Sequence, residues 1–473
     1  MKLNLIEALN AAEIAKIDNL SRQLLSKKGI LIPSEEVKDI LVKKGIKFDG
    51  FIAKFDDKVI EESLKSVPPN IRLFNNDLSD SIDIGKDTKY ASGHNAIYMF
   101  DKNTKKRIPA KKSEVENFAL LADFLEDIDI VGIEAYPQDV NPKSSILHGL
   151  DAVLNNTSKP VYFSPENYIE VEFLLKIIEA VSSDFKNLPV GICQVSPHSP
   201  LAWDEVTIKA LIMLAEKNFP AVVLPAPFSY VSAPITLAGE ILQSNAELLS
   251  ALVITQLINP GTPLIFGNAK SDADLATGEY LIGTPECNLF RAASAQIAKY
   301  YNVPSHSIGP DTDANQHDMQ NGFEKGMSLV AASMADTSII VNAGMFATGM
   351  TVSYEQLLID TEMIKFMKRF REGIDVVEEK LAYKSLLDVE HGKDFLADPL
   401  TIKYLRSNEH VESSVSNRKN YQSWIQAGAP DIADNAGKLA GQILKNHKPK
   451  RMDRSIKTRI TSIIDEFEKK YGK

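Results

Sequence analysis

The stretch Ser305-His-Ser-Ile-Gly-Pro-Asp-Thr-Asp-Ala-Asn-Gln-His-Asp-Met-Gln-Asn-Gly-Phe-Glu-Lys-Gly326 follows a short extended segment and leads into an apolar helix at residues 327–334. Its histidine, aspartate, asparagine and glutamine side chains make it a long polar connection. Long polar connections on rigid scaffolds often carry function, whereas a simple turn is shorter and richer in Gly and Pro. The alternative is a solvated loop whose Asp and Asn side chains satisfy their own turns.

The same order of strand, connection and helix repeats along the chain. Short apolar segments separated by helical patterns are the signature of parallel strands with crossover helices. Helices after every strand favour a closed barrel over an open doubly wound sheet, and no Gly-x-Gly-x-x-Gly follows the first segment. We therefore predict an α/β protein built on a (β/α)8 TIM barrel. The apolar segments are residues 128–133, 160–163, 190–195, 221–224, 263–266, 303–308 and 338–341.

An eighth strand is needed to close the barrel, and we expect it at residues 280–282, near 120–130, or at 345–352. Helical patterns precede and follow the repeats, and residues 95–101 alternate like a strand. Ser113-Glu-Val-Glu116 has the form of a capping box that opens a helix. The expected divisions are residues 1–90 as N-terminal helices with a small β-layer, 91–372 as the catalytic barrel and 373–473 as a C-terminal helical extension.

The composition limits the partners and the compartment. A net charge of −10 argues against nucleic acid or an anionic membrane as the main partner. Cys193 and Cys287 form no disulfide framework, which fits a reducing compartment. Polar residues interrupt the N-terminus where a signal peptide is continuously apolar. We expect a cytoplasmic protein, with the C-terminal helices as decoration or as a contact in a homo-oligomer.

In a barrel, the active site lies at the carboxyl ends of the strands. The residues at those positions are polar and aromatic, without a recognisable phosphate-binding loop. They are Glu134, Tyr136, Ser164, Gln194, Ser196, His198, Pro225, Phe228, Gly267, Asn268, His306, Asp311 and residues 342–346.

Several blocks, in order, resemble the core of the trimethylamine methyltransferase family over about residues 90–372. Residues 196–201 match more loosely, because a His-Ser insertion interrupts a Ser-Pro-Leu. The matching blocks are Ser-Ala-Pro-Ile-Thr-Leu-Ala-Gly at 232–239, and residues 245–249, 259–267, 283–286, 295–301, 313–320 and 349–360.

The resemblance implies a (β/α)8 barrel that moves a methyl group from a methylamine to the Co(I) corrinoid of a small partner protein. Trimethylamine enzymes of the family carry pyrrolysine, whereas this chain has only standard residues. The pyrrolysine position falls near residues 322–324, so Phe323 stands near it. The chain thus resembles the non-pyrrolysine branch, which acts on glycine betaine and related quaternary amines. The implied cofactor is cobalamin carried by the partner, with none bound covalently.

The chemistry agrees with that branch. Methyl transfer from a quaternary ammonium to Co(I) releases a neutral amine, whereas an unactivated tertiary amine would leave as an amide anion. Positioning then does most of the enzyme's work. A quaternary ammonium donates no N–H hydrogen bond, so aromatic rings hold it by cation–π contacts of about 0.5–2 kcal/mol each.

The resemblance and this chemistry select the candidate site residues, with core packing as the alternative for each aromatic ring. Glu134 is expected to offset the ammonium charge, and Asp313 is expected either to do so or to cap a turn. We expect no metal. The candidate catalytic residues are Asp313, Phe323 and His317; the substrate-binding residues are Tyr98, His94, Glu134, Phe228, Phe346 and His306; the corrinoid-facing residues are Asp311, Asn315, Gln316 and Asp318.

Three other functions stay open. The first is a metal-dependent barrel hydrolase, whose metal could in principle be bound by His306, Asp311, Asp313 and His317. The spacing of these residues fits no ligand pattern, and the first segment lacks the His-x-His of such hydrolases. A Schiff-base aldolase would have to use Lys270. The third is a non-catalytic barrel that binds a quaternary amine or docks a corrinoid protein.

Overall fold

Eight short parallel strands form the centre of the computed structural model, which describes residues 5–102 and 104–472. One parallel sheet has the order β13-β12-β11-β10-β9, and a second sheet has the order β16-β17-β6. Two isolated parallel bridges, Ala91↔Ile130 and Phe266↔Ser305, lie between the edges of these sheets. The strands are β6 (Lys89–Ser92), β9 (Val131–Gly132), β10 (Val161–Phe163), β11 (Gly191–Val195), β12 (Ala221–Val223), β13 (Leu264–Phe266), β16 (His306–Ile308) and β17 (Ile339–Ala343).

Helices follow these strands along the chain. Apolar side chains of the strands pack against the helices on one face and against one another on the other face. Alternate strand residues pack in two directions, as the pleat requires. Ile130, Ile192 and Val341 belong to an inner cluster, whereas Val131 and Cys193 pack in the larger cluster shared with the helices. The helices are α4 (Lys112–Phe124), α5 (Ser145–Leu154), α6 (Tyr168–Val181), α7 (Glu205–Glu216), α8 (Leu237–Ile258), α9 (Pro285–Tyr300), α10 (Met319–Met334) and α11 (Tyr354–Glu372), with a 3-10 turn at Pro142–Ser144.

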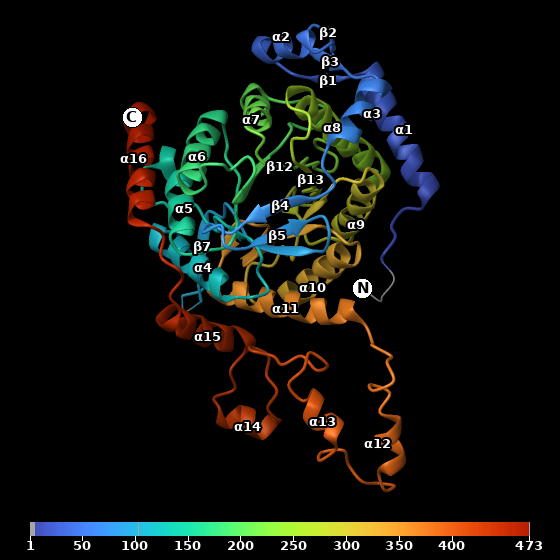
Figure 1. The fold of residues 1–473 in the computed structure, drawn as a ribbon, viewed down its shortest axis with the longest axis vertical. Coiled ribbons are helices and arrows are strands. Elements are labelled where there is room, and N and C mark those ends of the chain that lie inside the picture. The colour runs from blue at the N-terminus through green and yellow to red at the C-terminus, as the bar shows by residue number, and fades with distance from the viewer. Residues whose placement is uncertain (1–4, 103, 473) are drawn as a thin grey trace.

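A hairpin of β4 (Ile71–Phe74) and β5 (Ser81–Ile84) covers the amino ends of the parallel strands and lies across the front of Figure 1. The Phe74 amide donates to the Pro189 carbonyl just before β11. Leu73 and Ile84 pack into the inner cluster. This end of the strands is therefore closed by apolar side chains.

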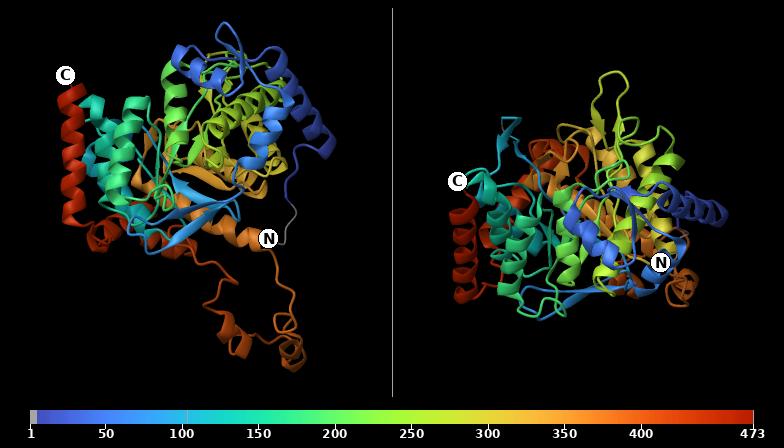
Figure 2. Two further views of the ribbon diagram at one scale, coloured as in Figure 1. Left: turned by 45° about the horizontal axis from the view of Figure 1, so that its top comes forward. Right: turned by 90° about the horizontal axis from the view of Figure 1, so that it is seen from above.

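Two hairpins stand at the opposite, carboxyl ends of the strands. β14 (Asp272–Ala273) pairs with β15 (Tyr280–Leu281), and β7 (Tyr98–Asp101) pairs with β8 (Lys106–Pro109). Both project from the same side in the right view of Figure 2, the first in yellow and the second in pale blue. β18 (Met345–Phe346) and β19 (Thr351–Val352) extend the β7–β8 hairpin.

The seven predicted strands are confirmed, but all three expected positions of the eighth were wrong. The eighth parallel strand is β6, which pairs with β17, whereas residues 280–281 form the antiparallel strand β15. Lys-Tyr-Ala-Ser is neither an apolar run nor a clear alternation, which explains why the pattern missed it. The capping box was also misplaced, because Lys111 precedes α4 and Glu114 accepts its amide.

The polar connection after β16 is shorter than expected. α10 begins at Met319, since Asp318 caps it by accepting the Asn321 amide at 3.0 Å. Gly322 and Gly326 suggested a loop, but both lie inside this helix.

The N-terminal part packs on one side of the parallel strands. α1 and α3 lie against α8, and a small antiparallel sheet has the order β1-β3-β2. The elements are α1 (Ala11–Lys27), β1 (Ile30–Leu31), α2 (Glu35–Lys43), β2 (Lys47–Asp49), β3 (Ile52–Lys54) and α3 (Asp57–Ser66).

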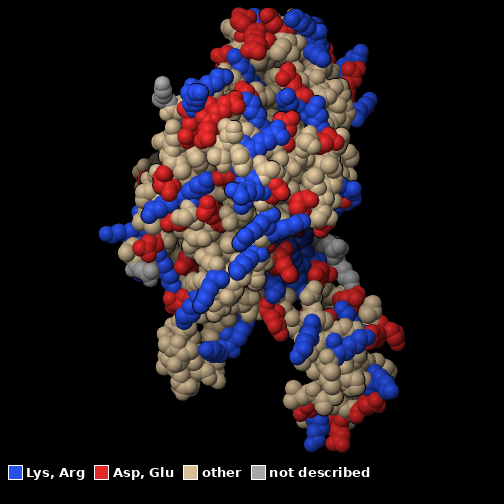
Figure 3. Space-filling view, turned by 60° about the vertical axis from the view of Figure 1, so that its left-hand side comes forward, with Lys and Arg blue, Asp and Glu red and all other residues tan. Residues whose placement is uncertain are grey.

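The C-terminal part has two different halves. α15 (Ile432–Asn446) packs against α11, and α16 (Arg454–Tyr471) packs against α6. Between α11 and α15, residues 374–430 project away from the body and carry α12 (Tyr383–Asp388), α13 (Pro399–Tyr404) and α14 (Tyr421–Gln426). We call residues 374–430 the arm. In Figure 3, the left of the two lobes below the body is largely uncharged on this face, whereas the right lobe also carries side chains of both charges.

α8 is, among the described residues, the helix long and apolar enough to cross a membrane by length and composition. The rest of the protein buries 83% of its apolar window, and Glu240 and Glu247 lie within the helix. Its apolar surface is therefore used in packing.

Candidate active site

A buried polar cluster lies among the parallel strands. Tyr162 on β10 donates to the Gln194 side chain on β11, and its hydroxyl oxygen lies 3.1 Å from His306 Nε2 on β16. The His94 ring meets the Tyr162 ring edge-on, with centroids 4.9 Å apart. Burial lowers the pKa of His94 to about 4 and that of His306 to about 3. Both imidazoles are therefore neutral at physiological pH and offer N–H donors without a charge.

Glu134 follows β9 and is fully buried next to this cluster. Its Oε1 accepts the Gly93 amide at 3.1 Å, so the residue beside His94 contacts the carboxyl group directly. A Cβ atom on Gly93 would lie 2.7 Å from Oε2, so glycine is required for this approach. Burial raises the pKa of Glu134 to about 8, which keeps much of this carboxyl group protonated at neutral pH.

A buried ion pair lies behind Glu134. Lys325 on α10 and Asp360 on α11 are 2.8 Å apart, and both side chains are fully buried. Lys325 also donates to the Pro310 carbonyl, and Asp360 accepts the Gly344 amide. The pair thus joins the connection after β16 to the connection after β17. Removing one partner of such a pair leaves a buried charge uncompensated.

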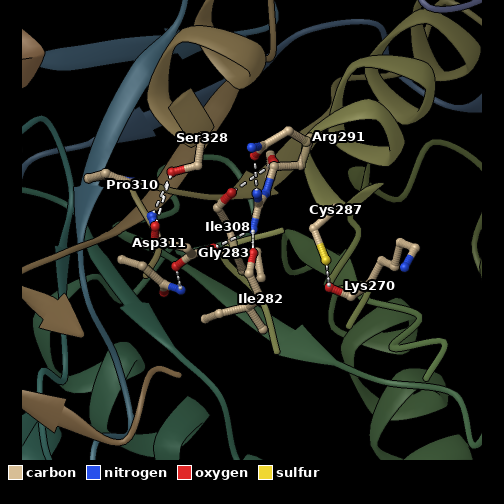
Figure 4. A network of polar contacts seen from close by, with 12 residues as sticks. Lys270, Ile282, Gly283, Cys287, Arg291, Ile308, Pro310, Asp311 and Ser328 are labelled. Atoms are coloured by element: carbon tan, nitrogen blue, oxygen red, sulfur yellow. Dashed lines mark hydrogen bonds and ion pairs between the residues drawn. The ribbon is translucent and has the colours of Figure 1, made fainter. Parts of the chain in front are cut away.

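Asp311 forms a second buried ion pair, with Arg291 of α9. The Arg291 guanidinium donates to Asp311 at 2.8 Å and to the Ile282 carbonyl at 3.0 Å. Asn342, at the end of β17, donates to the other oxygen of Asp311 at 3.1 Å. Figure 4 shows this network, with Ser328 hydrogen-bonded to Asp311 and the Cys287 thiol beside Lys270. Asp311 therefore holds the connection rather than lying on the surface.

Asp313 accepts the backbone amides of Ile282 and Gly283, at 2.8 and 3.0 Å. Its own amide donates to Glu324 on α10 at 2.8 Å. Burial raises the pKa of Asp313, and Glu324 adds to that rise. Asp313 thus ties the connection after β16 to the segment just before α9.

His317 and Phe346 lie together. The two rings are 5.3 Å apart, and Phe100 packs against both of them. His317 Nε2 is 2.9 Å from the Ser353 hydroxyl, and burial lowers its pKa to about 4. Tyr98 lies on the neighbouring hairpin strand β7, where Arg107 approaches its ring.

The remaining candidates lie at the rim. Phe323 is 62% exposed on α10, outside the buried cluster. Asn315 accepts from Arg107 at 2.5 Å, and Gln316 donates to Asp318 at 3.2 Å. Phe228 packs against Tyr280 of the β14–β15 hairpin, with centroids 5.5 Å apart.

Several buried polar atoms at these strand ends have no hydrogen-bond partner within residues 5–102 and 104–472. Buried polar groups are nearly always paired, so each such atom requires an explanation. A polar ligand between the strand ends would supply the partners. The atoms are His94 Nδ1, Glu134 Oε2, Asn268 Oδ1, Arg291 Nε, His306 Nδ1 and Asn342 Oδ1.

Sequence reasoning missed Tyr162, Lys325 and Asp360. Tyr162 sits mid-strand, where the pattern reads as core, and buried ion pairs between helices leave no local signal. Lys270, the Schiff-base candidate, contacts Asp272 and Glu240. Although burial opposes the charge, nearby Cys287, Asp272 and Glu240 raise the pKa of Lys270. In the described part of the chain, no group of three or more His, Cys, Asp or Glu side chains could hold a metal ion.

Comparison with known proteins gives the family. Residues 1–472 match the family model "Trimethylamine methyltransferase (MTTB)". The chain is 28% identical over 466 residues to the trimethylamine methyltransferase MttB of Desulfitobacterium hafniense (strain DSM 10664 / DCB-2), covering 97% of this chain and 94% of that protein. It is also 28% identical over 473 residues to the glycine betaine methyltransferase of Desulfitobacterium hafniense (strain Y51), covering 98% of each.

A similar fold occurs in the crystal structure of the monomethylamine methyltransferase (MtmB) of Methanosarcina barkeri. The TM-score is 0.50 with 12% sequence identity, over 91% of this chain and 92% of that chain. The family model covers nearly the whole chain, and the relatives are named methyltransferases. The chain therefore belongs to the trimethylamine methyltransferase (MTTB) family, and the protein is a methyltransferase.

Proposed function

We propose that this methyltransferase takes a methyl group from a quaternary amine of the betaine type and passes it to the Co(I) corrinoid of a small partner protein. The observation that carries the proposal is the arrangement at the strand ends, where a neutral donor cluster adjoins a single acid. His94, Tyr162 and His306 form the cluster, and Glu134 is the acid. A betaine has the complementary ends, a carboxylate and a quaternary ammonium.

The neutral cluster suits the carboxylate end. N–H donors bind a carboxylate, and the low pKa values of His94 and His306 keep both imidazoles uncharged. Their charge state therefore does not change with pH in the physiological range. Because the Tyr162 hydroxyl donates to Gln194 and accepts from His306 Nε2, the donor of this cluster that we assign to the carboxylate is the N–H of His94.

The ammonium end requires an acid and aromatic rings. Glu134 ionises when a permanent cation lies beside it, because the cation favours the carboxylate. The His317, Phe346 and Phe100 cluster supplies rings of the kind that hold quaternary ammonium groups. Because the leaving amine is neutral, none of these residues has to give it a proton.

Two relatives with equal identity, 28%, carry different substrates in their names. The substrate argument therefore rests on the residues of this chain. All of them are standard, and Phe323 stands near the position where trimethylamine enzymes of the family carry pyrrolysine. A quaternary substrate needs no such special residue, because its leaving group is already activated.

The corrinoid supplies the nucleophile that accepts the methyl group, and we propose that its protein docks on the rim of the carboxyl ends. Asn315, Gln316, Asp318 and Phe323 are exposed there. Val231, 68% exposed, and Leu275, 79% exposed, add apolar surface on neighbouring connections. Exposed apolar groups beside a site are typical of docking surfaces.

We also propose that the eight parallel strands close into a (β/α)8 barrel, residues 89–372, between the N-terminal part and the C-terminal extension. The two bridges between the sheet edges and the pairing of β6 with β17 support closure. Buried free cysteines and the net charge of −10 support a cytoplasmic location without a nucleic-acid partner.

The test follows methylation of a reduced corrinoid protein by its absorption spectrum. Glycine betaine, proline betaine, carnitine, γ-butyrobetaine, choline and trimethylamine are each added as the methyl donor. We expect turnover with one or more carboxylated quaternary amines. No turnover with any quaternary amine, given a competent cognate partner, would sink the proposal, and so would turnover with trimethylamine alone.

A matched pair of variants tests the carboxylate assignment. His306→Gln should raise KM for the active betaine at least tenfold while leaving any choline turnover little changed. His148→Gln is the control, because His148 lies on α5 and contacts Glu468 of α16. Equal losses on betaine and choline would contradict the assignment.

A further inference from the structure

The arm, residues 374–430, exposes an unusual amount of apolar surface. α12, α13 and α14 bury none of their residues. Apolar side chains that are about two-thirds exposed or more occur along its length: Leu387, 66%; Leu396, 80%; Ile402, 69%; and Tyr421, 68%. Many exposed apolar side chains on a projecting segment mark an interaction site.

The arm is held at one place and extends beyond it. Glu362 of α11 accepts the Ser414 amide at 2.6 Å and the Ser416 amide at 3.2 Å. Val415 between them is buried in the main core. Residues 409–416 are thus anchored to α11, whereas α12 lies at the far end of the arm in Figure 1.

A cavity of about 760 Å³ lies where the arm leaves the body. Phe366 and Phe370 of α11, with Ile374 and Val411 of the arm, give it apolar walls. Arg418 adds positive charge, whereas Arg369 already lies 3.9 Å from the carboxylate of Glu409, and His410 and Gly373 complete the lining. The cavity therefore suits an apolar segment that also carries acidic groups.

This root cavity is at the end of the protein away from the candidate site. Arg371, next to Phe370, donates to the hydroxyl of Thr88, the residue just before β6 begins. The arm therefore starts at the amino ends of the parallel strands, whereas the site residues lie at the carboxyl ends. A partner that docks over the site does not cover the arm root.

The tip of the arm has the complementary chemistry. Residues 386–398 read Leu-Leu-Asp-Val-Glu-His-Gly-Lys-Asp-Phe-Leu-Ala-Asp, which combines apolar side chains with four acidic ones. Leu386, Leu387, Phe395 and Leu396 are exposed. The same chain therefore carries the root cavity and, at the tip of the arm, a segment whose side chains match that cavity.

We propose that two copies of this chain exchange arms, so that the tip at residues 386–398 of each copy fills the root cavity of the other. A twofold axis makes both contacts identical and leaves no open end, as closed homodimers require. A permanent partner is needed, because an arm this apolar would aggregate if it were bare between encounters. A second copy is always present in equal amount, whereas a methyl-accepting protein must dock and leave.

Light scattering on the full-length chain after size exclusion tests the assembly. We expect a mass of at least twice 52.3 kDa. Leu396→Glu at the tip and Phe370→Glu in the cavity should each lower that mass. Leu275→Glu is the matched control, because Leu275 is 79% exposed on the hairpin at the opposite end, and its mass should equal that of the wild type.

Mixed disulfides test the contact itself. One preparation carries Leu396→Cys and the other Phe370→Cys, in a chain whose own two cysteines are buried. Oxidation should give a cross-linked dimer only after the two preparations are mixed and re-equilibrated. Circular dichroism confirms that each variant is folded.

Three outcomes would overturn arm exchange. The first is a wild-type monomer at micromolar concentration, and the second is an oligomer whose mass neither substitution changes. The third is an arm that becomes protected from protease only when a corrinoid protein is added.

Discussion

The strand ends and the arm depart in opposite ways from the usual burial of apolar groups and exposure of polar groups. At the strand ends, polar atoms such as Glu134 Oε2 and Asn342 Oδ1 are buried and have no partner in the described chain. On the arm, apolar side chains such as Leu396 are bare. Each arrangement is costly in isolation, because buried polar groups lose water and exposed apolar groups order it.

The difference indicates which kind of partner each region binds. Unpaired buried dipoles are matched by a small polar ligand that fits among them, whereas a bare apolar limb is matched by another protein surface. The strand ends are also held rigidly by two buried ion pairs, and the arm is tied to the body at residues 409–416. The rigid strand ends can position a substrate for reaction, whereas the projecting arm can reach another protein.

The strongest test of the rigid side removes Arg291. Arg291→Met leaves Asp311 buried without its cation, so we expect the free energy of unfolding to fall by about 3–5 kcal/mol. Urea unfolding measures the change. Lys299→Met on the same helix is the control, because Lys299 is mostly exposed, and it should stay within about 0.5 kcal/mol of wild type.

A second change at the same pair separates charge from packing. Arg291→Met with Asp311→Leu should recover part of the lost stability, since no buried charge then lacks a partner. If Arg291→Met alone costs less than about 1 kcal/mol, the pair does not hold the strand ends.

Glu134 gives a pH-dependent test of the same region. Its folded pKa, about 8, lies above the ordinary value of 4.5, so the folded state holds a proton that the unfolded chain releases. This contribution is fully present below about pH 4.5 and is lost as the pH rises through 8. The loss of unfolding free energy between pH 5 and pH 8 should therefore be smaller in Glu134→Gln than in wild type.

The groups facing Glu134 are Asp360, which raises its pKa, and Lys325, which lowers it, and the substitution leaves both in place. Glu216→Gln, at an exposed helix end, should keep the wild-type pH profile. Betaine binding should also release a proton, seen by calorimetry in two buffers, and Glu134→Gln should abolish that release. Identical profiles for wild type and Glu134→Gln would contradict a neutral buried Glu134.

The smallest expected effect on stability is at Phe323. Since its ring is 62% exposed, Phe323→Ala should change unfolding by less than about 0.5 kcal/mol. Leu329→Ala on the same helix, where Leu329 is 2% exposed, should cost about 2–5 kcal/mol. In the methyl-transfer assay, Phe323→Ala should raise the KM for the corrinoid protein and leave the KM for the betaine unchanged. The reverse pattern would place Phe323 in the amine site rather than on the rim.

Much of the fold follows from local pattern. The seven apolar segments are strands because residues buried on both sides read as short apolar runs. β6 escaped because Lys89 and Ser92 break that run, and its partner β17 lies 250 positions further along the chain. α10 was expected to start late because its glycines read as a loop, although Asp318 provides the cap.

The site was only partly accessible from sequence. Glu134 and His306 were selected by their positions at the ends of strands and His94 as a candidate for substrate binding, and the structure brings them close together. Lys325 and Asp360 could not be paired, because they meet across two helices and nothing in either local sequence marks the contact. The roles assigned to the candidate residues stay predictions until the variants are measured.

The pairing of β6 with β17 has a consequence for synthesis. β6 leaves the ribosome early, but the strand beside it, β17, emerges only after another 250 residues. At about 5–20 residues per second, the β6 edge waits on the order of tens of seconds without that neighbour. During this interval the nascent chain presents a bare strand edge and is exposed to misassembly. Expression in cells should therefore respond to translation speed and to chaperones that shield strand edges.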